Sequence, residues 1–149
     1  MHPLVSDPAS GAELRERIPF VKDLGIELVS GVGGRSRVEL DVLPRHLNSW
    51  GGVHGGVTMA MLDVAMAVAA RSLEPEGGGV LTIEMKTSFM QAGPPQGRVV
   101  VTGACVHRST GMAFCEAEMR DDQDRIVARA SGTFKFLRRS AARESSKEV

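Results

Sequence analysis

This sequence has few aromatic residues and no excess of positive or negative charge. Of its 149 residues only 4% are aromatic, with five phenylalanines, one tryptophan and no tyrosine. Lysine plus arginine equal aspartate plus glutamate, at 18 each. No net charge attracts nucleic acid or an anionic membrane, and no basic stripe is interleaved with aromatic residues. We therefore expect no nucleic acid and no membrane among the partners, and the length fits one domain.

Cysteines and targeting signals are also scarce. Cys105 and Cys115 are too few for a disulfide framework, and no Cys-x-x-Cys pair points to zinc. They flank a predicted hairpin turn at residues 109–111 and can face each other across it as reduced, buried thiols. The N-terminus has no basic start followed by an apolar run, which predicts no signal peptide and a cytoplasmic location.

The chain is organised around a long apolar stretch, residues 54–71. Between Val57 and Ala70 only Thr58 and Asp63 are polar, which predicts a helix that is buried nearly all round. It is too short for a membrane span and carries a carboxylate. A carboxylate in an apolar helix is costly to desolvate unless it is paired or useful. Asp63 is therefore either satisfied by backbone or an arginine, or it belongs to a functional site.

A helical projection at 100° per residue separates small from large residues around Asp63. The small residues and two methionines fall on its side of the helix: Gly56, Met59, Ala60, Met66, Ala67 and Ala70. Branched residues such as Leu62 and Val68 lie about 100° or more away. Small residues beside a carboxylate leave room for a ligand, and flexible methionines can shape its wall.

The helix entry adds a second signal. Gly55 and Gly56 let another group approach the first, unpaired N–H groups of the helix. Those donors, together with the positive end of the helix dipole, suit a developing oxyanion. Glycines before a helix also occur in ordinary turns, so this signal is weak on its own. His46, His54 and Asp63 are not at helical ligand spacing, and we expect no metal.

The rest of the chain is predicted to be mostly strand. A short helix over residues 10–18, with Ser10 as its N-cap and Pro19 as its stop, precedes a connector at residues 20–25. Strand-like runs with short turns, which imply antiparallel pairing, cover residues 26–32, 35–42, 80–90, 98–107, 112–120 and 125–137. This order predicts an α+β fold in which a curved antiparallel sheet wraps around one helix.

Three segments follow from this organisation. Residues 1–19 form an N-terminal segment with a short helix, residues 20–137 the domain, and residues 138–149 a flexible charged tail. An irregular loop over residues 45–53 leads into the central helix, and a glycine-rich exit over residues 74–79 follows it.

The spacing Asn48-x-x-Gly51-x-x-His54-Gly55-Gly56, with Asp63 seven residues further on, resembles that of the hotdog-fold acyl-CoA thioesterases. The resemblance is greatest to their PaaI/THEM2-like group and covers residues 20–136. It implies a hotdog fold and hydrolysis of an acyl-CoA to free acid and coenzyme A. It implies no cofactor, since coenzyme A is part of the substrate. It also implies a homodimer with active sites at the interface and further pairing of dimers.

The same resemblance implies roles for five residues. Asp63 takes the position of the catalytic carboxylate, as general base or as nucleophile. Gly55 takes that of the backbone N–H that polarises the thioester carbonyl, and Asn48 that of a loop amide that orients carbonyl or water. Thr82 matches a hydroxyl that holds the attacking water, where one member of that group carries serine. His54 belongs to the motif in a loop-orienting role, because the helix dipole disfavours an imidazolium there.

Helix geometry leads to a dimer independently of the resemblance. Gly55 and Asp63 are eight residues apart, which is about 12 Å along a helix. An oxyanion donor lies about 3 Å from its oxygen, and a base acting through one water is only a few ångströms away. One helix cannot place both groups at one thioester, whereas two helices related by a two-fold axis can. We therefore predict an obligate homodimer.

Further residues are candidates for substrate contact, each with a structural alternative. Met59, Met66, Met85 and Phe89 line the acyl pocket or pack in the core. Trp50 gates the site or anchors its loop, and Gly56 adds a backbone N–H. Arg108 contacts a phosphate of coenzyme A, as Lys135 and Arg138 also can, or is a solvated charge. The acyl group stays open between aryl groups such as phenylacetyl and medium chains.

Two alternative functions remain. A hotdog-type hydratase or dehydratase pairs a carboxylate with a histidine, and His54 and Asp63 of two subunits could form that pair. An acyl-CoA-binding protein without catalysis could use the same pocket. Activity on enoyl-CoA separates the first alternative from hydrolysis, and tight binding without thiol release identifies the second.

Overall fold

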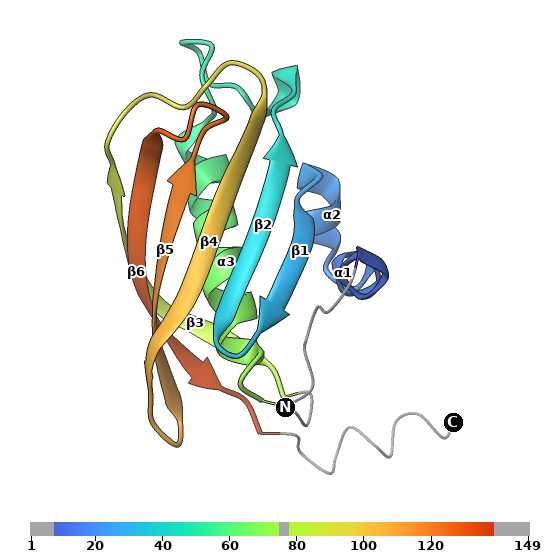
Figure 1. Ribbon diagram of the computed structural model, residues 1–149, viewed down its shortest axis with the longest axis vertical. Coiled ribbons are helices and arrows are strands. Elements are labelled where there is room, and N and C mark those ends of the chain that lie inside the picture. Colours follow the sequence, from blue (N-terminus) through green and yellow to red (C-terminus); the bar gives the residue numbers. More distant parts are fainter. Residues whose placement is uncertain (1–7, 75–77, 139–149) are drawn as a thin grey trace.

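The computed structural model describes residues 8–74 and 78–138, in which a six-stranded sheet curves around one long helix (Figure 1). The elements in chain order are α1 (Pro8–Glu16), α2 (Pro19–Leu24), β1 (Glu27–Val32), β2 (Arg35–Asp41), the 3-10 turn η1 (Pro44–His46), α3 (Gly55–Arg71), β3 (Val80–Phe89), β4 (Arg98–Arg108), β5 (Met112–Arg120) and β6 (Ile126–Phe136). All paired strands are antiparallel, in the order β1-β2-β4-β5-β6-β3. The predicted α+β architecture is confirmed.

The central helix lies directly on the sheet because one strand residue has no side chain. A Cβ atom at Gly103 on β4 would lie 2.6 Å from the backbone oxygen of Ala65 in α3. The Ser36 hydroxyl of β2 donates a hydrogen bond of 2.6 Å to the same oxygen. The contact between α3 and the sheet therefore combines a close backbone approach with one polar anchor.

The N-terminal region differs from the prediction. The first helix begins at Pro8, so Ser10 lies within its first turn instead of capping it. Pro19 begins a second helix, α2, where a connector was expected. Proline suits the first helical position because it has no N–H that needs an acceptor there. Gly25, with φ of 77°, closes α2 in the left-handed conformation and donates its N–H to Lys22.

Strand β3 forms one edge of the sheet, next to β6 (Figure 1). Four large apolar side chains on and just after this strand are each about half exposed: Leu81, Ile83, Phe89 and Met90. An open edge that also exposes apolar side chains is a surface prone to pairing with another chain.

Some expectations concern residues outside the described ranges. The predicted charged tail lies outside them apart from Arg138, which is exposed. The loose start over residues 1–7 and residues 75–77 of the glycine-rich exit also lie outside. No helix in the described part of the chain is long and apolar enough to cross a bilayer.

The contact at Gly103 leads to a stability prediction. Gly103→Ala places a methyl group against backbone and is expected to lower the free energy of unfolding by about 1–3 kcal/mol. Gly111→Ala is the matched control, because a Cβ there would have no neighbour within 4 Å, and it should change stability by less than about 0.5 kcal/mol. Urea unfolding at one protein concentration measures both, and equal stabilities would contradict the proposed contact.

Candidate active site

The side chains of Asp63 and Thr82 meet between α3 and β3. The Thr82 hydroxyl donates a hydrogen bond of 2.7 Å to Asp63 Oδ1. Thr82 pairs with the fully buried Phe134 of β6, which places it on the face of β3 that is turned toward the helix. The resemblance therefore pointed to two residues, 19 positions apart, that the fold brings into direct contact.

The helix α3 is not buried all round, which corrects the prediction made from its composition. Its branched face is in the core, where Met61 and Leu62 have no exposed surface. The opposite stripe stays partly open in the single chain, and Met59 is 38% exposed beside the half-buried Asp63. Of the small residues near Asp63 that the projection identified, Gly56, Ala60 and Ala67 line the partly open stripe, whereas Ala70 is fully buried. Asp63 thus keeps access to water.

The entry of α3 is organised by His54, which is the N-cap. Its Nδ1 accepts the Gly56 N–H at 2.8 Å, and its backbone oxygen accepts from Val57 and Thr58. Within residues 8–74 and 78–138, no group accepts the Gly55 N–H. The two glycines are therefore not equivalent, since Gly56 uses its donor for the cap while Gly55 keeps its donor for another partner.

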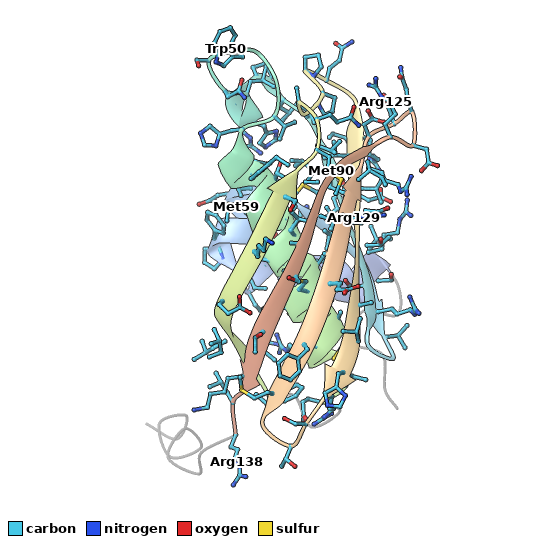
Figure 2. All side chains as sticks on the ribbon, turned by 90° about the vertical axis from the view of Figure 1, so that its left-hand side faces the viewer. Trp50, Met59, Met90, Arg125, Arg129 and Arg138 are labelled. Carbon is cyan, nitrogen blue, oxygen red and sulfur yellow. The ribbon has the colours of Figure 1, made fainter. Side chains whose placement is uncertain are left out.

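The loop before α3 is held by Asn48. Its Oδ1 accepts the N–H of Trp50 at 2.9 Å and that of Gly52 at 3.2 Å. Gly51 has a φ of 81°, in the left-handed region that a side chain would strain. Trp50 lies at the tip of this loop and is 94% exposed, on the side of the molecule that also carries Met59 (Figure 2).

His46 is a structural residue that the sequence analysis considered only as a metal ligand. It is buried, its Nδ1 accepts the Leu43 N–H at 2.9 Å, and its Nε2 lies 2.7 Å from the Leu24 oxygen. Its backbone oxygen accepts the His54 N–H at 2.8 Å. His46 therefore ties the end of α2 to the entry of α3. In the described ranges, no three His, Cys, Asp or Glu residues are grouped to hold a metal ion.

Other predicted contact residues have different environments. Met66 has no exposed surface and packs in the core against Gly132, so the structure supports its core-packing alternative. Phe89 is 52% exposed, and its ring lies beside Gly55. Arg108 forms an ion pair with Glu74, donates to the Leu73 oxygen, and covers the Phe136 ring. Its guanidinium thus already has partners in this chain.

Comparisons with known proteins agree with this geometry. The thioesterase superfamily model matches residues 51–128. A putative esterase of Mycobacterium tuberculosis is 34% identical over 82% of this chain and 89% of its own. Its solved structure aligns with a TM-score of 0.75, covering 83% and 99% of the two chains at 33% identity. The PaaI protein of Escherichia coli has a TM-score of 0.79 at 23% identity, over 88% and 94% of the chains, which is a likeness of fold.

The architecture is therefore the hotdog fold, with a carboxylate and a hydroxyl placed between its helix and its edge strand. The chain belongs to the thioesterase superfamily and is a thioester hydrolase.

The cap at His54 gives a prediction that does not depend on activity. His54→Ala removes the acceptor for the Gly56 N–H and should cost about 1 kcal/mol of stability, the usual value for an N-cap. His54→Asn restores a short acceptor and should recover at least half of that loss. Urea unfolding of the three proteins provides the measurement. An alanine variant as stable as the wild type would show that the cap contributes nothing.

Proposed function

We propose that the protein hydrolyses acyl-CoA thioesters with Asp63 as its catalytic carboxylate. The observation that carries this proposal is the Thr82–Asp63 hydrogen bond at the partly open stripe of α3. A relative from Listeria monocytogenes, named 1,4-dihydroxy-2-naphthoyl-CoA hydrolase, is 28% identical over 70% of this chain and 84% of its own, and supports a coenzyme A ester as substrate.

The contact between the two side chains suits activation of water. Thr82 keeps its proton and donates its O–H hydrogen bond to Asp63 Oδ1, so its oxygen can accept a hydrogen bond from a water molecule. Asp63 removes a proton from that water, which attacks the thioester carbonyl carbon. The tetrahedral intermediate then expels coenzyme A as a thiolate, which needs neither a strong general acid nor a cofactor. In the alternative route, Asp63 attacks the carbonyl itself and water releases the acyl group from a mixed anhydride.

The oxyanion donor in this proposal is the Gly55 N–H of a second subunit. Gly55 and Asp63 are about 12 Å apart along α3, too far for both to act on one carbonyl. A two-fold axis beside the open stripe brings Gly55 of one copy to Asp63 of the other. The free donor at Gly55 and the open edge of β3 support this homodimer. We also propose that these dimers pair into a dimer of dimers and that the protein is cytoplasmic.

The acyl pocket is proposed to lie between the stripe and β3, with Met59 and Phe89 as its walls. Both side chains are partly exposed in the single chain and lie near the helix entry. Phe89 offers a flat face to an aryl group, and Met59 adapts to an aryl group or a medium chain. Asn48 and Trp50 form the adjoining loop. Arg108 can bind a phosphate of coenzyme A only if its guanidinium contacts the phosphate in addition to, or in place of, Glu74.

The catalytic roles give a kinetic prediction. Asp63→Asn keeps the shape of the side chain and should lower turnover by at least about 100-fold. Thr82→Val should lower turnover by about tenfold or more, whereas Thr82→Ser keeps the hydroxyl and should stay close to wild type. The measurement is thiol release from phenylacetyl-, hydroxybenzoyl-, short-chain and medium-chain acyl-CoA.

The outcomes separate the competing functions. Full activity of Asp63→Asn removes Asp63 from the mechanism. No thiol release from any substrate by folded wild-type dimer contradicts hydrolysis, and hydration of an enoyl-CoA or tight binding without turnover then identifies the alternative. Hydrolysis in heavy-oxygen water under single turnover tests the nucleophile route. Label in Asp63 identifies a mixed anhydride whose Asp63 carboxyl carbon was attacked by water, whereas the base route labels the product acid alone.

The shared site gives a prediction of its own. Gly55→Pro should fold, since proline fits the first helical position and His54 already has the extended conformation, with ψ of 137°, that precedes a proline. It removes the proposed donor. Mixing inactive Gly55→Pro and Asp63→Ala subunits should recover activity, because each heterodimer contains one site with both groups intact. Confirmed heterodimers without recovered activity would exclude a site shared in this way.

A further inference from the structure

The two cysteines are paired across the sheet, although the proposed reaction uses neither. Cys105 on β4 and Cys115 on β5 are register partners, and both are free thiols. We propose that they form a modification site, in which a peroxide converts the two thiols into a disulfide between neighbouring strands.

The backbone hydrogen bonds define the kind of pair they form. The Cys105 N–H donates to the Gly34 oxygen at 2.7 Å, on the side of β4 that faces away from β5. In an antiparallel ladder the N–H and C=O of one residue point to the same neighbour, so Cys105 and Cys115 are a non-hydrogen-bonded pair. Such pairs have Cα atoms about 4.5 Å apart and close side chains, within the range that disulfides span.

The environments of the two thiols differ. Cys115 is 2% exposed, and burial, with Cys105 beside it, raises the pKa of its thiol to about 12. Cys105 is partly exposed, and its Sγ contacts the His107 oxygen at 3.3 Å beside a bulge in β4. An oxidant from solvent therefore reaches Cys105 first, and Cys115 by itself is unreactive.

The chemistry balances with hydrogen peroxide as the oxidant. The Cys105 sulfur attacks one peroxide oxygen, which gives a sulfenic acid and one water. The Cys115 sulfur then displaces the sulfenic oxygen as a second water, with its own proton, and the disulfide forms. Two thiols and one peroxide thus give one disulfide and two waters, and a dithiol reverses the reaction.

The order of the two steps can be tested in the folded protein with dimedone, which traps sulfenic acids. After exposure to hydrogen peroxide, peptide mapping of the wild type should show Cys105 linked to Cys115 of the same chain, with little dimedone adduct. Cys115→Ala should retain dimedone on Cys105. Cys105→Ala, the matched variant, should oxidise at Cys115 at least about tenfold more slowly than the wild type.

Other outcomes overturn the proposal. The first is dimedone labelling of Cys105 that is as strong in the wild type as in Cys115→Ala. The second is a disulfide between the Cys105 residues of two chains. The third is loss of the Cys115 thiol in Cys105→Ala at the wild-type rate. The melting temperature gives a second readout that needs no variant, because a cross-strand link should raise Tm and dithiothreitol should lower it again.

Discussion

The helix α3 has two roles, because it packs in the core of the sheet and also carries the carboxylate of Asp63. The rest of the structure depends on how its residues divide between these roles. Its branched side packs on the sheet, where Met61 and Leu62 are fully buried. The bare backbone at Gly103 lets the helix approach the strands, and Ser36 anchors its backbone oxygen. Because packing occupies one side only, the small residues around Asp63 stay on the other side, where a substrate can reach the carboxylate.

Polar contacts around α3 hold the candidate site in place and leave free the groups that the proposed reaction uses. Thr82 engages one oxygen of Asp63, His54 takes the donor of Gly56, and Asn48 closes the loop in front of the helix. Among the described residues, the Gly55 N–H is left without an acceptor. Hydrogen bonds that orient a group while leaving its functional atom free are what preorganised sites require.

The sequence predicted the features that depend on periodicity and spacing. The six strands, the long helix, and the grouping of small residues around Asp63 follow from local patterns that the fold then preserved. Prediction from the sequence failed where the same residue type can take two structural roles. Pro19 stops one helix and also starts another, and a glycine N–H can serve a cap or a ligand. Arg108 and Met66 could not be placed, because their partners Glu74 and Gly132 come from elements distant in sequence.

The position of Thr82 links the chemistry to assembly. The strand that orients Asp63 is also the open edge of the sheet, and its apolar side chains are about half exposed. A single chain would leave that edge unpaired and would leave Gly55 about 12 Å from the carboxylate. In the proposed dimer, one two-fold contact along β3 and the α3 stripe covers the exposed apolar side chains and brings a Gly55 donor to each carboxylate. The same surface thus accounts for stability and for a complete site, which is why we propose that the catalytic unit is the dimer.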